Sequence, residues 1–267
     1  QIEINYIKKI LGIELTTKQI LDLLSKARYS AKIKGNKIIA EYPSYRNDIL
    51  HPIDVIEDIL ISYGYNNFRT QKTELPVTGK LLKKTSLIEN TREICVGLGL
   101  QEILTFTMTS KEKQEKKLGL KDQEFVEIEN PMSSNYAIFR KNLFPELLEF
   151  LSKNKNALYP QKIFEIGKTL ELNASTQTGV QEKERVAIVI SDKKANFTTA
   201  KSIFENICQN LGLEFEIKES NLIYLEKGKS AIAVGKEKKA LFGELSEKTM
   251  QEFKIEEKTI IIELDLE

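Results

Sequence analysis

The chain has 267 residues, a length typical of about two domains. Hydrophobic residues make up 41% of the sequence, which is enough to form buried cores and too many for an intrinsically disordered protein. Its 40 basic and 39 acidic residues leave a formal net charge of +1, whereas a dedicated nucleic-acid binder usually has a clear basic excess. We therefore expect any contact with RNA to be local or to be supplied by a partner.

The residue content excludes several common types of enzyme site. His51 is the single histidine, so a histidine-rich zinc site or an HExxH motif cannot be built. Neither a P-loop nor a GxGxxG motif occurs. Cys95 and Cys208 lie far apart in the sequence, which is typical of reduced thiols in a cytoplasmic protein. No apolar run approaches the roughly 18–20 residues that span a membrane, so we expect no membrane association.

Residues 1–70 predict a small αα-ββ-α domain with a winged-helix-like shape. Apolar residues at helical spacing indicate the helices, Thr16 or Thr17 is a suitable N-cap for the second one, and Gly12 and Gly64 mark helix ends. The predicted elements are helices at residues 4–11 and 18–26, strands at residues 29–33 and 37–42, and a helix from about residue 52 to residue 64.

Residues 71–84 are polar and contain Pro76 and Gly79, so they predict a connector. Residues 85–267 alternate irregularly between helical and strand patterns, which predicts an α+β domain with an antiparallel sheet flanked by helices. Its first predicted helix ends near residue 98. Further helices are predicted at residues 111–117, 144–150, 196–212 and 246–253, and the helix at 111–117 is expected to be a charged, solvated face. Its predicted strands cover residues 103–108, 125–129, 162–172, 185–191, 214–218, 231–234, 240–243 and 259–264.

Four carboxylates gather around the start of the helix predicted at residue 52, namely Asp48, Asp54, Glu57 and Asp58. At 100° per residue, the three acids of the helix fall opposite a broad apolar face. That predicted face consists of Ile53, Ile56, Ile59, Leu60 and Tyr63.

Two interpretations of the acidic cluster remain open. Acids in the first turn of a helix are favoured by the helix dipole, by about 0.3–1 kcal/mol each, and can simply face solvent. However, like charges three and four residues apart repel each other by about 0.2–0.5 kcal/mol per pair. A hard divalent cation such as Mg²⁺ would satisfy all four, since it prefers carboxylate oxygens and water. Arg46 and His51 are the nearest bases that could neutralise one or two of them.

The segment SYRNDILHPIDVIEDILISYGYNNF closely resembles the pattern R-x-DI-x₄-D-x-[IV]-E-[DE]-x₄-YGY of the phenylalanyl-tRNA synthetase β subunit family. Further segments resemble the same family in the same order, so the resemblance covers essentially the whole chain. They are REICVGLGLQEILTFTMTS, ENPMSSNYAIFRKNLFPELLEFLSKN, QKIFEIGKTLEL and, near the end, FGELSEKTMQEFKI and IIELDLE.

The resemblance implies an (αβ)₂ heterotetramer that ligates phenylalanine to its tRNA with ATP and Mg²⁺. In this family the α chain carries the active site, and the β chain carries an inactive module with the class II synthetase fold. The family's Mg²⁺ position, shared with the α chain, matches Asp48, Asp54, Glu57 and Asp58. The sequence lacks the family's N-terminal editing domain and the C-terminal RNA-binding domain of bacterial β chains, so we expect a fragment of the archaeal or eukaryotic type.

The arginines independently predict that this chain is not catalytic. Adenylate formation needs cations on the triphosphate, and arginine suits this role because its fork grips phosphate with two hydrogen bonds. Class II synthetases use one arginine on a central strand and one late in the domain, near residues 243–246 of this sequence, but no arginine follows Arg185. Lys248 is a poor geometric substitute. Arg140 could take the earlier role, yet it precedes an apolar helix and is better explained as a structural pair.

Three functions follow from these observations. The leading one is a noncatalytic scaffold that packs on α through the helix before Gly97 and the strand after it, and touches tRNA locally. The lysines considered for that contact are Lys83, Lys84, Lys153 and Lys155. The second is a nucleic-acid-binding module formed by the first domain, although its acidic last helix would repel phosphate. The third is a stand-alone adenylating protein, which the missing late arginine opposes.

Overall fold

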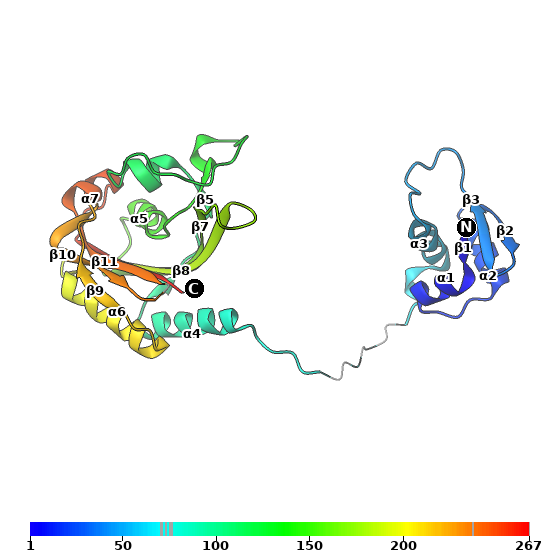
Figure 1. The fold of residues 1–267 in the computed structure, drawn as a ribbon, viewed down its shortest axis with the longest axis horizontal. Helices are drawn as coiled ribbons and strands as arrows, with labels where there is room; N and C mark the ends of the chain where they lie inside the picture. The colour runs from blue at the N-terminus through cyan, green and yellow to red at the C-terminus, as the bar shows by residue number, and fades with distance from the viewer. Residues whose placement is uncertain (70–71, 73, 75–76, 237, 267) are drawn as a thin grey trace. The chain divides into compact units, whose positions relative to one another are not determined.

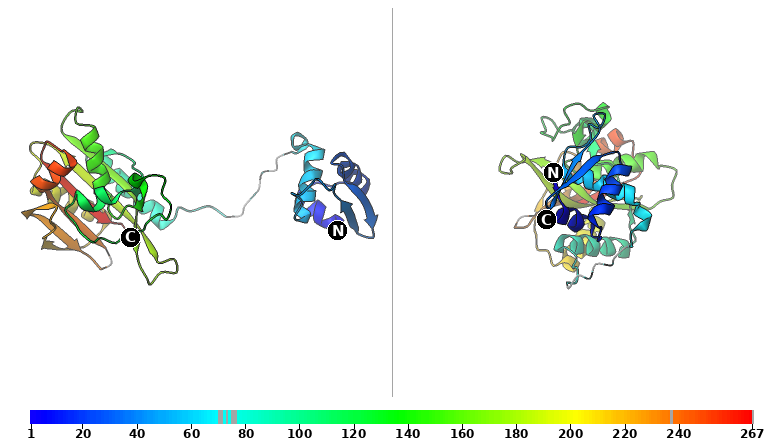
Figure 2. Two further views of the ribbon diagram at one scale, coloured as in Figure 1. Left: turned by 90° about the horizontal axis from the view of Figure 1, so that it is seen from above. Right: turned by 90° about the vertical axis from the view of Figure 1, so that its right-hand side faces the viewer.

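The computed structural model describes every residue except 70–71, 73, 75–76, 237 and 267 (Figure 1). The chain forms two compact units, Gln1–Thr78 and Gly79–Glu267, and Figure 2 shows their elements from two further sides. The connector predicted at residues 71–84 falls partly outside the described residues. At its far end, Lys83 already begins a helix. None of the helices in the described part of the chain is long and apolar enough to cross a membrane.

The first unit is a three-stranded antiparallel sheet with three helices. The strand order is β1-β3-β2, so the sheet gains an edge strand that the predicted αα-ββ-α order did not include. This strand pairs Ile2 with Ile38, and both side chains are buried. The elements are β1 Ile2–Glu3, α1 Ile4–Leu11, α2 Thr17–Lys26, β2 Ser30–Lys34, β3 Lys37–Glu41, α3 Pro52–Tyr63 and the short 3₁₀ turn η1 Tyr65–Asn67.

Local capping explains where the first helices begin and end. The Thr16 hydroxyl accepts a hydrogen bond from the backbone N–H of Gln19, whose side chain returns one to Thr16, which is a capping box. Gly12 ends α1 with a φ of 67°, a left-handed conformation that glycine adopts without steric cost. These signals are local in the sequence, and the predicted helices 4–11 and 18–26 are confirmed to within one residue.

The buried face of α3 differs from the predicted one. Val55, Ile56 and Ile59 enter the core, whereas Ile53 is 44% exposed. The prediction that Ile53 lies on the buried face is therefore wrong. Ile53 follows Pro52 in the first turn of the helix, and the three core residues share one side at spacings of one, three and four. They join a core that contains buried residues from β1, α1, α2, β3 and α3.

The second unit is built on a long sheet of seven strands among the described residues. Their order is β4-β7-β8-β12-β11-β10-β9, and all neighbours are antiparallel except β4 and β7. The sheet strands are β4 Gln101–Glu102, β7 Gln161–Leu172, β8 Val180–Ser191, β9 Glu216–Glu219, β10 Leu225–Val234, β11 Lys239–Leu245 and β12 Thr259–Asp265. The helices are α4 Lys83–Gly97, α5 Phe144–Lys153, α6 Phe197–Leu211 and α7 Glu247–Phe253.

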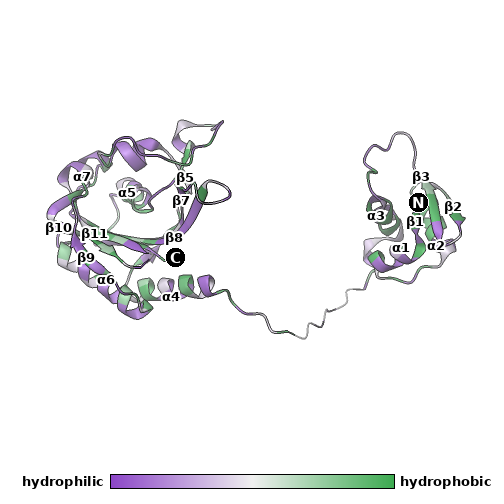
Figure 3. Cartoon of the chain, viewed as in Figure 1, coloured by the Kyte–Doolittle hydropathy of each residue, from purple (hydrophilic) through white to green (hydrophobic). Residues whose placement is uncertain are grey.

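Helices cover both faces of this sheet. One core packs α4 and α6 against one face, and a second core packs α5 and α7 against the other (Figure 1). Strand β12 serves both cores because successive side chains point to opposite faces: Ile260 and Ile262 face α6, while Ile261 faces α5. Figure 3 shows that α4 and α6 each carry hydrophobic and hydrophilic residues, as expected of helices with one buried side.

The segment between α4 and α5 departs most from prediction. The strand predicted at 103–108 is replaced by β4 and by β5 Met108–Thr109, which pairs with β6 Ile138–Phe139. The strand predicted at 125–129 is reduced to a single bridge from Glu127 to Ile138. The charged helix predicted at 111–117 is a short π-helix, η2 Glu112–Lys116, followed later by the 3₁₀ turn η3 Ser134–Tyr136.

The expectation of a purely solvated face for residues 111–117 is also wrong. Gln114 is buried, its amide donates to the carbonyl of Asn142, and its side-chain oxygen accepts from the backbone N–H of Asn142. This one polar side chain fixes η2 against the segment that leads into α5.

Candidate functional site

Two of the four predicted acids of the first unit meet on one arginine. Arg46 grips Asp48 with two hydrogen bonds of 2.7 Å, and its Nη2 also contacts Asp58 at 3.0 Å. Because both contacts use the same nitrogen, the two carboxylates lie close together. Arg46 lowers the pKa of Asp48 through these bonds. The Tyr29 hydroxyl donates to Asp58, and burial together with this carboxylate raises the pKa of Tyr29.

The third acid, Asp54, is committed to the start of α3. It accepts hydrogen bonds from the backbone N–H groups of Leu50 and His51, at 2.8 and 2.6 Å. In return, the Nδ1 atom of His51 accepts from the backbone N–H of Ile53 at 3.2 Å. This reciprocal cap satisfies backbone donors that the first helical turn would otherwise leave unpaired. His51 therefore acts as a helix cap in this chain.

The fourth acid, Glu57, is exposed and makes no hydrogen bond or ion pair with another described residue. In the described part of the chain, no three Asp, Glu, His or Cys side chains are arranged so as to hold a metal ion. The structure thus brings Asp48 and Asp58 together through Arg46, assigns Asp54 to a cap, and leaves Glu57 available to solvent or to a partner.

Arg185 is the centre of a charge cluster on the α5 face of the second unit. It lies on β8, and its Nε bonds Asp265 on β12 at 2.6 Å, while Nη2 bonds Glu171 on β7 at 2.7 Å. Its Nη1 contacts Glu263 on β12 at 3.2 Å and also donates to the carbonyl of Lys141. Burial alone would lower the pKa of Arg185, but the three carboxylates outweigh it and raise that pKa.

Glu263 ties this cluster to the start of α5. Its Oε2 atom accepts hydrogen bonds from the backbone N–H groups of Leu143 and Phe144, both at 2.9 Å. Burial raises the pKa of this carboxyl, and Arg185 and the two N–H groups oppose that shift only in part. The helix start and the sheet are therefore joined by a single buried side chain.

Arg140 is paired within the protein, as the sequence interpretation of a structural pair predicted. Its Nη1 bonds Glu165 at 2.6 Å and Thr105 at 2.8 Å, and its Nε donates to the carbonyl of Lys168 at 2.9 Å. The guanidinium is 3% exposed. A Cβ atom at Gly167 would lie 2.4 Å from its Nη2, so glycine is needed there to leave room for the arginine.

Both buried arginines are held by protein oxygens, because Arg140 binds Glu165 and each nitrogen of the Arg185 guanidinium contacts a carboxylate. The position considered for a late arginine is also occupied by structural contacts. There, Glu244 accepts from the backbone N–H of Phe197 at 2.9 Å, Ser246 caps α7, and Lys248 is exposed. Catalysis of adenylate formation requires cations directed at the triphosphate, and this sheet directs its cations at its own carboxylates.

Three of the lysines considered for tRNA contact are already paired. Lys84 lies 3.1 Å from Glu184, Lys153 lies 3.3 Å from Glu149, and Lys155 lies 2.9 Å from Glu256. Glu184 is buried, whereas Lys153 and Lys155 form exposed or half-exposed pairs that contribute about 0–1 kcal/mol, so a nucleic acid could compete for these two lysines.

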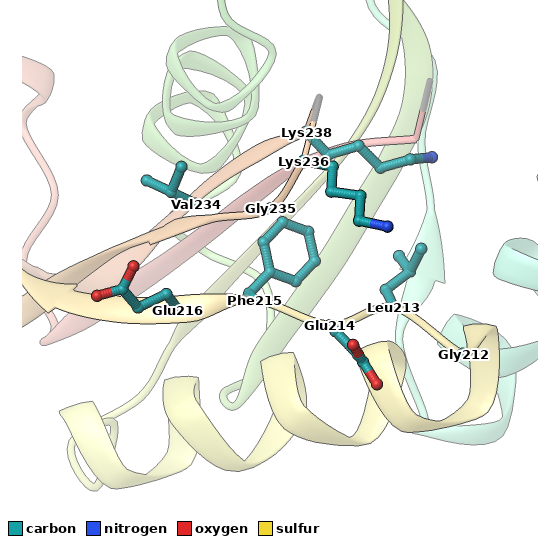
Figure 4. A pocket seen from close by; sticks show the side chains of 9 residues that line it. All are labelled: Gly212, Leu213, Glu214, Phe215, Glu216, Val234, Gly235, Lys236 and Lys238. Atoms are coloured by element: carbon teal, nitrogen blue, oxygen red, sulfur yellow. The ribbon is translucent and has the colours of Figure 1, made fainter.

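Several pockets lie on the second unit. An open pocket of about 830 Å³ lies where α6 meets β9 and β10, with the Phe215 ring in its middle (Figure 4). Its charged side chains, such as Glu216 and Lys238, spread around the rim and form no ion pair with each other. A smaller cavity of about 220 Å³ lies beside Arg185 and Glu263.

Solved structures with a similar arrangement define the class of fold. The chain is similar to two structures of pyrrolysyl-tRNA synthetase from Desulfitobacterium hafniense, each with a TM-score of 0.56 and 16% identity. The matches cover 69% of this chain and 66–67% of those chains. The mixed α and β architecture is thus that of a class II aminoacyl-tRNA synthetase, and at this identity the likeness concerns the fold alone.

Sequence comparison identifies the family. The family described as the phenylalanyl tRNA synthetase beta chain CLM domain matches residues 69–266, and the tRNA synthetase B5 domain matches residues 1–65. The phenylalanine–tRNA ligase beta subunits of Thermococcus sibiricus and Pyrococcus abyssi are 37% and 36% identical over 96% and 100% of this chain. This chain belongs to the phenylalanyl-tRNA synthetase beta chain family. It spans about half the length of these curated relatives, 46% and 48%.

Replacing Arg185 with Met should destabilise the second unit strongly. Glu263 and Asp265 would remain buried, and Glu171 partly buried, without their shared cation, which typically costs about 3–5 kcal/mol. The difference in stability between the variant and the wild-type chain should shrink as the pH falls, because the variant's unpaired acids become protonated and lose their charge. The wild-type chain loses stability over the same range, since Arg185 and Lys183 outweigh burial and lower the pKa of Glu171. Urea unfolding at neutral and acidic pH measures both effects.

The control is Lys168→Met, which breaks an exposed ion pair with Glu182 of 2.7 Å and should cost about 0–1 kcal/mol. Equal losses for the two variants would contradict a central role for Arg185.

Proposed function

We propose that this chain is the noncatalytic scaffold of a phenylalanine–tRNA ligase β subunit, a cytoplasmic enzyme of protein synthesis. In this proposal it packs on and orders a catalytic α subunit within an (αβ)₂ heterotetramer. The α subunit uses ATP to join phenylalanine to its tRNA, and the fragment alone is inactive. The observation that carries the proposal is the binding of Arg140 and Arg185 to protein carboxylates, on a fold whose active members need free cations.

The exposed apolar surface after α4 supports packing on a partner. Leu104 and Phe106 are 82% and 70% exposed, although each belongs to a residue type that is normally buried. The Phe106 ring meets Tyr136 edge-on, with 5.9 Å between ring centroids. Leu82 and Val96, at the two ends of α4, are also exposed. Exposed apolar side chains of this kind are expected at an interaction site, and obligate interfaces bury about 2,000 Å² or more.

Association with the α subunit tests this function. In titrations of the β chain containing this sequence with its own α subunit, Phe106→Ser combined with Leu104→Ser should weaken association at least about tenfold, because two apolar anchors are lost. Ile217→Ser, which changes an exposed residue of the edge strand β9, is the control and should leave association unchanged. Light scattering gives the stoichiometry. Full-strength assembly of the double variant would exclude this surface from the interface.

We further propose that Asp48, Asp54, Glu57 and Asp58 help to hold a Mg²⁺ ion together with the α subunit. In this chain alone they do not form one set of ligands, since Arg46 balances two of them and Asp54 caps α3. The ion would therefore require ligands from α and the withdrawal of Arg46 from at least one carboxylate. Two features support this: two of the acids already lie close together, and Glu57 is unengaged and exposed.

Mn²⁺ is a suitable paramagnetic probe for this shared site. The α–β complex should bind one more Mn²⁺ per α–β pair than the separated subunits do, and Glu57→Gln should remove that ion or weaken it at least about tenfold. Glu57 is exposed, so this change should not affect folding. Glu41→Gln, an exposed acid of the same unit, is the matched control. An unchanged Mn²⁺ count in the Glu57→Gln complex would mean that the acids are only a solvated helix start.

A second function rests on the β2–β3 hairpin of the first unit. Lys32, Lys34 and Lys37 are exposed along it and would form the basic edge of a winged-helix-like nucleic-acid binder. The carboxylates of α3 oppose this function by repelling phosphate. Salt-sensitive DNA affinity that is lost on replacing Lys32 and Lys34 with Ser would favour it.

A further inference from the structure

The small cavity beside Arg185 has an ordered floor. Strand pairing sets Ile232 of β10 beside Leu241 of β11, and Leu241 beside Glu263 of β12. Paired residues point to the same face of a sheet, so these three side chains form one row under the cavity. Asp265 lies one step along the same face of β12. The enclosed volume of about 220 Å³ equals that of about seven waters, which suits a small molecule and is too small for a nucleotide.

The Tyr224 hydroxyl is the unexplained group in this cavity. Tyr224 lines it, is only 5% exposed, and stacks its ring on Phe144 with 5.3 Å between centroids. Its hydroxyl makes no hydrogen bond with any residue that the structure describes. No buried side-chain oxygen or nitrogen of the described residues is left without a partner, so this hydroxyl is open to the cavity, where water or a ligand can pair with it.

The charges around the cavity disfavour an anion. Glu171, Glu263 and Asp265 outnumber Arg185 and Lys183 by one, and the Arg185 donors are already used. The Lys239 side chain at the rim is exposed, so solvent screens its charge. The Oδ2 atom of Asp265 retains capacity to accept, since its contacts are the Lys239 backbone N–H at 3.2 Å and Lys183 at 3.9 Å. A ligand that donates hydrogen bonds and carries positive charge fits these groups.

We propose that this cavity binds a small primary amine with a short apolar body. The ammonium group contacts Asp265 and the Tyr224 hydroxyl, and the apolar body lies on Leu222, Ile232 and Leu241. The site is formed by the second unit alone and requires neither the α subunit nor tRNA, so it goes beyond the scaffold function. It does not depend on the acidic cluster of the first unit.

The test uses 3-methylbutylamine as the probe, with 3-methylbutan-1-ol and 3-methylbutanoate as matched neutral and anionic molecules. Ligand-detected NMR with the whole chain should show saturable binding of the amine with a dissociation constant on the order of millimolar. The alcohol and the carboxylate should bind at least about tenfold more weakly. Absence of saturable amine binding, equal binding of all three, or preferred binding of the carboxylate would each overturn the proposal.

Tyr224→Phe isolates the hydroxyl. Because that hydroxyl has no protein partner, the variant should unfold at the wild-type temperature while binding the amine at least about fivefold more weakly. Tyr136→Phe, on the exposed surface after α4, is the control and should bind as the wild type does. Asp265→Asn should also weaken amine binding, because it removes the negative charge of the side chain while keeping its shape. Wild-type affinity in the Tyr224→Phe variant would show that the hydroxyl does not serve this ligand.

Discussion

The buried contact between Arg185 and its three carboxylates is the interaction on which the second unit depends. It joins strands β7, β8 and β12, and through Glu263 it fixes the start of α5. A cluster of this kind is stable only when complete, since each buried charge needs its partner. The same bonds that hold the sheet together place a carboxylate on each guanidinium nitrogen of Arg185. Structural support and the diversion of this cation from phosphate are thus two consequences of one geometry.

Arg46 has the corresponding role in the first unit, under weaker constraint. Its partner Asp48 is largely exposed and Asp58 is only partly buried, so these pairs can exchange for other ligands at low cost. Arg185 would make such an exchange at a much higher cost, because Glu263 and Asp265 are buried. This contrast supports a division of labour in which the second unit provides a rigid scaffold and the first unit offers a surface that a partner can remodel.

Local signals in the sequence predicted much of the fold. The capping box at Thr16, the glycine after α1 and the strand pattern of β7 all act over a few residues, and their elements appear where expected, whereas β8 begins five residues before the predicted strand at 185–191. The family resemblance is also confirmed by the comparisons. The segment between α4 and α5 was mispredicted because tertiary contacts, such as those of Gln114, decide its backbone. Ile53 was placed on the wrong side because helical spacing groups apolar residues on one side of a helix but does not show which of them face the core.

The sites show the same limit. Spacing on α3 grouped four acids, but it could not show that Arg46 bridges two of them or that Asp54 caps the helix. Apart from the Arg185–Glu171 bond, the contacts of the Arg185 cluster join residues about 40 to 120 positions apart, a distance over which no sequence pattern acts. Two acids at alternate positions of the apolar strand β12, Glu263 and Asp265, were the one available signal that a buried cation lies nearby.

Phenylalanine-dependent exchange of pyrophosphate into ATP tests the central claim most directly. It should be measured on this chain alone, on the α subunit alone, and on α assembled with the β chain that contains this sequence. We predict exchange in the assembled enzyme and none by this chain alone at any ATP concentration, since Arg140 and Arg185 are bound to its own carboxylates. Exchange by the chain without α would contradict the account, because it would require a free cation that the sheet does not provide.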